Sequence, residues 1–320
     1  MTAIDKPGLY HDVPEATYHA DPCPEPSLSH SVAVALLDQS PAHARAMHPR
    51  LGGESEWDPS SAADIGKAIH AGLTRTSAAI VVVDAKDWRT NDAKDQRAAA
   101  HAAGKVPLLK HQQEAVWDAT LNARMQIQKH EIAPDWKAGR GEVTVVWRET
   151  INGFSFWCRA RIDWLPDGDA PAFYDVKTTT GSADPDMWSR RLFDGGYDVQ
   201  AAFYRRGLRA VGFKRMREAR FVVLEQAAPH ALSVVALDPQ AVQMADEKVE
   251  RAMELWAACL KRETWPGYPA RICYAEAKPW EITKHAERQE RARERRELKG
   301  DIAAELMHWQ APARTKGEAA

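Results

Sequence analysis

Cysteine is scarce in this chain, with four residues among 320, and no two of them form a C-x-x-C pair. Closely spaced cysteines hold structural zinc ions and iron–sulfur clusters, so neither group is expected here. We predict that all four thiols are reduced and unpaired, as is usual in the cytoplasm. They are Cys23, Cys158, Cys259 and Cys273.

Long apolar runs are also missing. Nowhere does the sequence hold the stretch of about eighteen or more apolar residues that a transmembrane helix needs. Residues 1–20 do not have a basic stretch followed by an apolar one, so no secretory signal is expected. These absences predict a cytoplasmic protein without a membrane span.

Neither sign of charge dominates, because 43 Lys and Arg residues face 45 Asp and Glu residues, for a net charge of −2. A strongly basic balance would favour nucleic acid as a partner, and it is absent. An enzyme that must release DNA needs only a local basic surface, however, and acidic metal ligands lower the total. Residues 188–220 are such a region, with nine positive against three negative side chains. The same pattern also fits a solvated helix face.

The remaining composition, 44% hydrophobic and 28% charged, is typical of a soluble globular protein. We expect one domain over residues 1–280, opened by a proline-rich loop segment over 1–30, and a charged tail over 281–320 that is either an exposed helix or disordered. Apolar spacing and composition predict helices over 32–39, 61–73, 91–130 with a break at 104–107, 199–211 and 238–262. Residues rich in β-branched side chains predict strands over 81–88, 141–150, 154–166, 172–180, 220–226 and 232–238.

The middle strands have strong turn signals between them. Asn152-Gly153 is a hairpin turn sequence, and Pro166 to Asp169 forms a second turn. Residues 141–180 are therefore predicted to form an antiparallel meander.

This meander carries the residues with the clearest chemistry. Side chains alternate between the two faces of a strand, so Asp163 shares a face with Arg159 and Arg161, and Asp175 shares one with Lys177. Two neighbouring strands can thus present two carboxylates and an ammonium to one place. Such a set suits Mg²⁺, which prefers oxygen ligands, together with a phosphate.

Other candidates have weaker signals. His70 lies on a predicted helix one turn after Gly66, and a lone histidine there is often structural. Gln200 and Tyr204 lie at i and i+4 and share a helix face, which an ordinary amphipathic helix would also give. Glu142 begins a strand and could lean toward a metal or be solvated.

These motifs occur in a recognisable order: G-x-x-x-H, E, R-x-D, D-x-K and Q-x-x-x-Y. The order resembles that of the RecB-like and RecE-like branch of the PD-(D/E)XK nucleases. The opening segment GLYHDVPEATYHADP looks like the start of the RecE-like, or exodeoxyribonuclease VIII-like, enzymes. The resemblance covers residues 8 to 280. It implies an α/β fold with a restriction-endonuclease-like core, in which helices flank both faces of a central mixed sheet.

The resemblance also implies roles for particular residues. His70, Asp163, Asp175 and the backbone carbonyl of Val176 would bind Mg²⁺, with Mn²⁺ as a possible substitute, and Lys177 would be the catalytic lysine. Gln200 and Tyr204 would support the site or touch DNA, and Glu142 would join the catalytic set. Family members with an iron–sulfur cluster carry a C-terminal cysteine group, which this chain lacks. The candidate DNA-binding residues are Arg159, Arg161 and Arg205.

The implied activity is resection of double-stranded DNA ends in the 5′ to 3′ direction, leaving a 3′ single strand for recombination. RecE-like enzymes form ring-shaped oligomers and work with a RecT-like single-strand annealing protein, often from a phage. A structure-specific or single-strand endonuclease stays an alternative, because such a site acts on the phosphate and not on the base. A DNA-binding protein that has lost catalysis is the other alternative.

Overall fold

The computed structural model describes residues 4–52, 60–76 and 79–299. The chain divides into two compact units, Met1–Tyr268 and Pro269–Ala320. Within the described residues, no helix has both the length and the apolar character needed to cross a bilayer.

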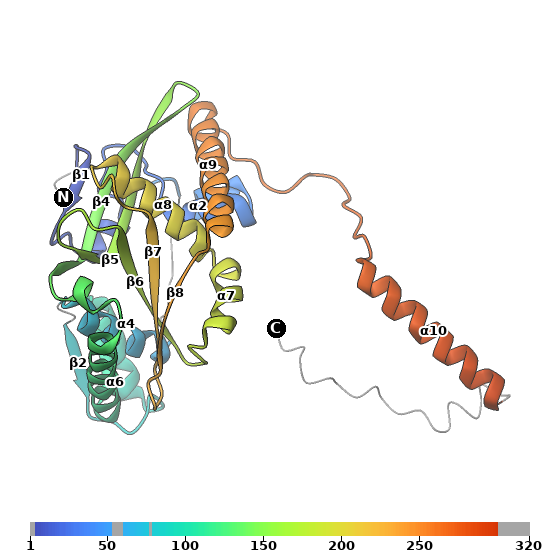
Figure 1. Ribbon diagram of the computed structural model, residues 1–320, viewed down its shortest axis with the longest axis horizontal. Helices are drawn as coiled ribbons and strands as arrows, with labels where there is room; N and C mark the ends of the chain where they lie inside the picture. Colours follow the sequence, from blue (N-terminus) through green and yellow to red (C-terminus); the bar gives the residue numbers. More distant parts are fainter. Residues whose placement is uncertain (1–3, 53–59, 77–78, 300–320) are drawn as a thin grey trace. The chain divides into compact units, whose positions relative to one another are not determined.

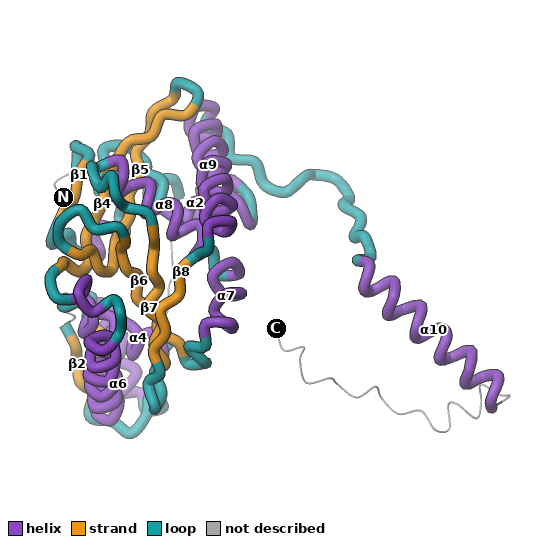
Figure 2. The backbone as a smooth tube through the Cα atoms, in the orientation of Figure 1, coloured by secondary structure: helices purple, strands orange, loops and turns teal. Residues whose placement is uncertain are grey.

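A mixed six-stranded sheet forms the centre of the first unit (Figures 1 and 2). All neighbouring strands are antiparallel except β6 and β7, which are parallel. The strands run in the order β1 (Gly8–Tyr10), β4 (Gly139–Ile151), β5 (Phe154–Pro166), β6 (Ala172–Thr179), β7 (Glu218–Glu225), β8 (Leu232–Ala236). The meander predicted over 141–180 is confirmed as β4–β5–β6.

The parallel pair needs a crossover connection, and two helices provide it. These are α7 (Pro185–Asp194) and α8 (Tyr197–Ala210). The sequence predicted only the second of them. The first is short, and its start is fixed by the side chain of Asp184, which accepts hydrogen bonds from the backbone N–H groups of Asp186 and Met187.

Helices cover both faces of the sheet (Figure 1). One face packs on α2 (His30–Asp38), α3 (Pro41–Met47), α8 and α9 (Pro239–Arg262), around a core that includes Trp147, Phe203 and Trp256. The other face packs on α4 (Ser61–Thr74) and α6 (Lys110–Lys129), with Ile69, Trp164 and Tyr174 at the centre. The predicted α/β fold with a helix-flanked mixed sheet is confirmed.

Two segments differ from the sequence predictions. The predicted loop over 1–30 contains β1, which pairs with β4, and the short helix α1 (Glu15–His19). The predicted helix break at 104–107 holds β3 (Val106–Leu109), which pairs in parallel with β2 (Ile80–Val83) across α5 (Asn91–Ala102). The short strands β1 and β3 have too little periodicity to be recognised, and the partner strand decides their conformation. β2 covers the start of the strand predicted over 81–88.

The second unit contains α10 (Pro279–Lys299), which is exposed and polar, and residues 300–320 of the predicted tail lie outside the described residues. Arg291 and Glu287 form one of its ion pairs at i, i+4.

A buried charge cluster ties the segment before α2 to the sheet. The carboxylate of Asp21 accepts hydrogen bonds from the N–H and Oγ of Ser27, and it lies 3.3 Å from both Arg159 and His48. Burial by itself would raise the pKa of Asp21, but His48, Arg159 and Ser27 hold it below its ordinary value. The ionised carboxylate therefore stabilises the fold at pH values above about 4, and this contribution is lost as the pH falls further.

Asp21→Asn should lower the free energy of unfolding by about 3–5 kcal/mol at neutral pH, because it leaves the buried guanidinium of Arg159 without its charged partner. Urea unfolding measures this loss. The variant should also lose less stability than the wild type between about pH 5 and pH 3. Asp118→Asn on the exposed face of α6 is the control and should stay within about 0.5 kcal/mol of the wild type. Equal stabilities of Asp21→Asn and wild type would contradict the role given to this cluster.

Candidate active site

Strands β5 and β6 bring together the acidic and basic residues of the predicted site. Asp163 on β5 accepts a hydrogen bond from the backbone N–H of Val176 on β6, at 2.7 Å. On the same strand, the ammonium of Lys177 lies 2.6 Å from Oδ2 of Asp175. Asp175 and Lys177 thus share one face of the strand, as the alternation of side chains requires.

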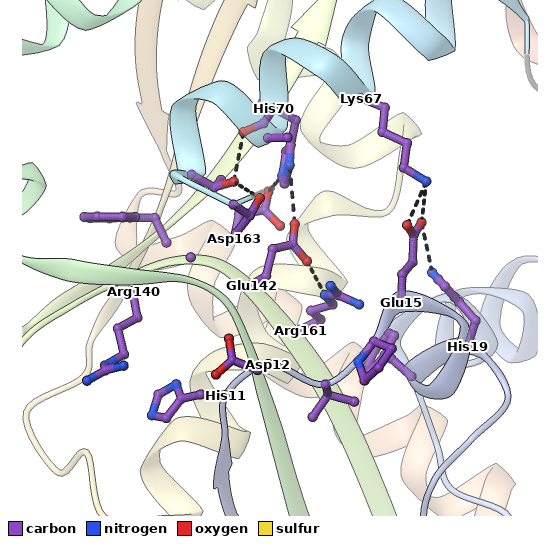
Figure 3. Close-up of a pocket in the computed structure, with 18 of the residues that line it drawn as sticks. His11, Asp12, Glu15, His19, Lys67, His70, Arg140, Glu142, Arg161 and Asp163 are labelled. Atoms are coloured by element: carbon purple, nitrogen blue, oxygen red, sulfur yellow. Dashed lines mark hydrogen bonds and ion pairs between the residues drawn. The ribbon is translucent and has the colours of Figure 1, made fainter. Parts of the chain in front are cut away.

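Helix α4 adds the imidazole of His70 (Figure 3). Its Nε2 lies 2.9 Å from Asp163, and its Nδ1 lies 3.3 Å from Glu142. One donor atom from each of His70, Glu142 and Asp163 falls within 4.8 Å of the others. We call these three residues the donor trio.

Glycine at position 66 allows this approach of α4 to the sheet. A Cβ on Gly66 would lie 2.5 Å from Oγ1 of Thr178 on β6, which is too close for a normal contact. The glycine of the G-x-x-x-H motif therefore permits the contact with β6, and the histidine one turn later reaches Asp163.

Gly66→Ala should lower any metal affinity and activity of the site by displacing His70. The double variant Gly66→Ala/Thr178→Ala should recover much of the loss, since it removes the atom that the new Cβ meets. Cation affinity by calorimetry measures both variants. If the single variant bound and acted like the wild type, this packing would not govern the position of His70.

Glu142 has an unusual backbone, with φ of +54° inside a strand. It lies between the paired residues Gly141 and Val143, opposite Asp163 on β5, and its carboxylate forms an ion pair with Arg161. A non-glycine residue in the left-handed region costs energy and occurs preferentially at functional sites. This conformation turns Glu142 toward His70, which strand periodicity alone could not have predicted.

Helix α8 supports the site from the other side of β6. Gln200 donates a hydrogen bond to Asp175, and its Oε1 accepts one from Lys177 at 3.2 Å. The hydroxyl of Tyr204 is hydrogen-bonded to Nδ1 of His30, at 3.0 Å. His30 was not among the predicted residues, because a single histidine at the start of a helix gives no signal in one sequence.

The ionisation of these groups is strongly coupled. Burial and then the neighbouring carboxylate of Asp163 together raise the pKa of Asp175 to about 6. Burial would lower the pKa of His70, but Asp163 and Glu142 bring it to about 9. Burial opposes the charge of Lys177 as well, and Asp175 and Asp163 overcome it and raise its pKa. A carboxylate kept partly protonated by burial and a like charge gains from a cation nearby.

The residues present fit a divalent cation. The donor trio offers two carboxylates and one imidazole, a set that magnesium, manganese and related ions accept. Oδ2 of Asp175 is buried and receives no well-directed hydrogen bond in the described part of the chain, although Lys177 lies beside it. Among the described residues, Glu142 forms the compact group with His70 and Asp163, while Asp175, which was also predicted as a ligand, is engaged by Lys177 and Gln200.

A cavity of about 1060 Å³ opens at the donor trio. The N-terminal segment forms one wall, where Glu15 on α1 forms an ion pair of 2.7 Å with Lys67 on α4 (Figure 3). Tyr18 is buried in this wall, and its ring lies 5.6 Å from the guanidinium carbon of Arg161. The segment that the sequence predicted as loop is therefore part of the site.

The three arginines predicted to bind DNA have different surroundings. Arg161 lines the cavity and pairs with Glu142. Arg159 also lines the cavity, but it is buried and donates hydrogen bonds to the carbonyl and hydroxyl of Ser27. Arg205 is buried against α9, pairs with Asp246, and does not line the cavity. Their burial and pairing give Arg159 and Arg205 structural roles, so we no longer assign them DNA contacts.

Arg140 is a better candidate for a DNA contact than Arg159 or Arg205. It is exposed, lines the cavity, and has no ion pair with another described residue (Figure 3). Sequence reasoning missed it, because an arginine at the start of a strand is common on protein surfaces.

The chain was compared with known protein families and structures. Residues 29–278 match the model of a PDDEXK-like domain of unknown function, DUF3799. Among curated proteins, none matches this chain in sequence.

One similar solved structure is a protein from Eubacterium rectale, provisionally described as an exonuclease. It is 13% identical, with a TM-score of 0.50, and the match covers 86% of this chain and 99% of that chain. At this identity the likeness concerns the fold alone. The structure of SSO0001 is 11% identical over 59% of this chain and 85% of that chain, and its TM-score of 0.26 is too low to support an argument.

Proposed function

The chain belongs to the DUF3799 family of PDDEXK-like domains, and from this premise we propose that it is a divalent-metal-dependent exodeoxyribonuclease acting on double-stranded DNA ends. One observation carries the proposal. His70 on α4, Glu142 on β4 and Asp163 on β5 offer metal ligands within 4.8 Å of one another, and the neighbouring strand β6 holds the Lys177–Asp175 pair.

Each group has a role in phosphodiester hydrolysis. A divalent ion held by the donor trio, with Asp175 and the carbonyl of Val176 as further ligands, would supply water activation and neutralise charge on the phosphate. The ammonium of Lys177 donates hydrogen bonds to the attacking water or to a phosphate oxygen where negative charge develops. Gln200 keeps Lys177 in place, and Tyr204 with His30 braces α8 against α2.

Two features favour a DNA end as the substrate. The cavity is walled on one side by the N-terminal segment, which suits a strand terminus better than an uninterrupted duplex. The Eubacterium rectale protein of similar fold is described as an exonuclease. A structure-specific or single-strand endonuclease is the second candidate, because the donor trio and Lys177 would act on any phosphodiester. An inactive DNA-binding protein is disfavoured, because each acidic and basic position of the motif is filled.

Digestion of end-labelled DNA tests the proposal. Linear duplex labelled at either the 5′ or the 3′ end is incubated with protein and Mg²⁺, Mn²⁺ or EDTA, beside covalently closed circles. Cation-dependent loss of linear DNA with circles spared is the expected result, and the label released first gives the polarity. Cutting of circles would favour the endonuclease, and intact linear DNA would contradict the proposal.

Arg140→Ala should weaken DNA binding and lower the slope of log affinity against log salt concentration by about one, because one phosphate contact is lost. Arg205→Ala is the matched control. It should leave the affinity and the salt slope unchanged and lower stability, since Arg205 pairs with Asp246 inside the protein. Binding titrations in EDTA at several salt concentrations measure both variants. If Arg205→Ala weakened DNA binding and Arg140→Ala did not, Arg205 would be the DNA contact after all.

The 5′ to 3′ polarity, the ring-shaped oligomer and the RecT-like annealing partner stay predictions from the RecE-like resemblance. The labelled digestion tests the first, and the mass of the protein in solution tests the second.

A further inference from the structure

Tyr197 lies directly against the ammonium of Lys177 and has no part in the mechanism above. The centre of its ring is 4.5 Å from Nζ of Lys177. Tyr197 begins α8, and Gln200 and Tyr204 follow it at i+3 and i+7, so the three side chains share the helix face that meets β6. Tyr197 is therefore placed by the same helix that supports the rest of the site.

The ring is held in one orientation by its neighbours. Trp188 on α7 stacks on it at 6.1 Å with an interplanar angle of 15°, and Phe221 on β7 packs at 6.0 Å. A Cβ on Gly195 would lie 2.9 Å from the ring, and Gly196 has φ of +66°. The two glycines before Tyr197 thus leave room for the ring and turn the chain into α8.

The chemistry of this contact suits a catalytic lysine. An ammonium has three N–H donors: Gln200 accepts a hydrogen bond from one, and the ion pair with Asp175, at 2.6 Å, occupies the side of a second without a well-directed hydrogen bond. An aromatic face attracts the positive charge without an oxygen or nitrogen acceptor, so it does not fix a third donor as a carboxylate would. The third donor stays available for the substrate.

We propose that Tyr197 is a positioning residue, whose ring face holds the ammonium of Lys177 aligned for catalysis while leaving a donor for the phosphate or water. The inference rests on the proposed nuclease function. Its alternative is that Tyr197 only fills space between α7 and β7.

Substitutions at position 197 distinguish an effect of the ring face from an effect of the hydroxyl group or of side-chain volume. The Tyr197 hydroxyl has no hydrogen bond among the described residues, so Tyr197→Phe should cleave DNA at nearly the wild-type rate. Tyr197→Leu should lower kcat by about tenfold, because a cation–π contact of this kind is worth on the order of that factor. KM and DNA affinity should not change, because Tyr197 does not line the cavity.

A fluorination series gives the decisive readout. Phenylalanine with one, two or three ring fluorines at position 197 keeps the size of the ring and weakens its negative face step by step. The single-turnover rate should fall with each fluorine at constant melting temperature. The metal-free protein gives a second readout: the ring should shift the NMR signals of the Lys177 ε-methylene protons upfield in wild type and Tyr197→Phe, and not in Tyr197→Leu.

The outcomes are distinguishable. Wild-type protein that cuts no DNA would contradict the nuclease function and this inference with it. Active wild type with equal rates across the fluorinated series, or with an inactive Tyr197→Phe, would overturn the role of the ring and leave the nuclease function standing. The series keeps the test valid even where Tyr197→Leu does not fold.

Discussion

Lys177→Met should lower the single-turnover rate of DNA cleavage by about 10²–10³-fold or more, the usual loss when a donor to developing negative charge is removed. In the described part of the chain, Lys177 on β6 is the one ammonium within 2.6 Å of a carboxylate of the predicted site, that of Asp175. Methionine keeps most of the side-chain volume and removes the charge and the donors. DNA affinity should stay close to that of wild type, because we expect the contacts to the sugar–phosphate backbone of DNA to come from residues on the cavity wall.

The control for this variant is Lys129→Met, which removes a lysine from the exposed surface of α6. It should cut at the wild-type rate. Rapid-quench measurement with saturating protein compares the two variants, and thermal unfolding checks that both are folded. A Lys177→Met protein within tenfold of the wild-type rate would contradict the role assigned to this lysine.

Asp163→Asn should remove divalent-cation binding along with activity. Asp163 contacts His70 and Val176, and its carboxylate lies closer to the His70 imidazole than the carboxylate of Glu142 does. Loss of even an outer-shell partner costs about 10–100-fold in metal affinity, so loss of a ligand carboxylate should cost at least as much. Calorimetry with Mg²⁺ and Mn²⁺ in the absence of DNA measures the affinity directly.

Asp12→Asn is the matched control, because Asp12 also lines the cavity but does not belong to the donor trio. Its cation affinity should equal that of wild type. Equal cation affinities for Asp163→Asn and Asp12→Asn would show that the trio is not the metal site.

Sequence reasoning succeeded where chemistry is local. The Asn152-Gly153 turn and the β-branched strands around it fixed the meander, and alternation along β5 and β6 predicted which faces carry Asp163, Asp175 and Lys177. The family resemblance then added His70, Gln200 and Tyr204 from their order along the chain.

Where tertiary contacts decide, the sequence named Glu142 and the G-x-x-x-H motif but could not show how they reach the site. Glu142 reaches His70 because its backbone is in the left-handed region. Helix α4 can pack closely on β6 because Gly66 has no Cβ to clash with Thr178. The short segments around α1 become a cavity wall through an ion pair with a residue far along the chain. Arg205 belongs to a basic stretch of sequence, yet α9 buries it, and one sequence without structure cannot separate exposed arginines from buried ones.

The most direct test of the central claim is one digestion in which linear and covalently closed circular DNA share a tube with wild-type protein, Lys177→Met or wild type with EDTA. The account predicts that wild type with Mg²⁺ removes the linear DNA and leaves the circles, while the other two reactions leave both intact. Linear DNA that survives with wild type and Mg²⁺, or that disappears equally with Lys177→Met, would contradict it.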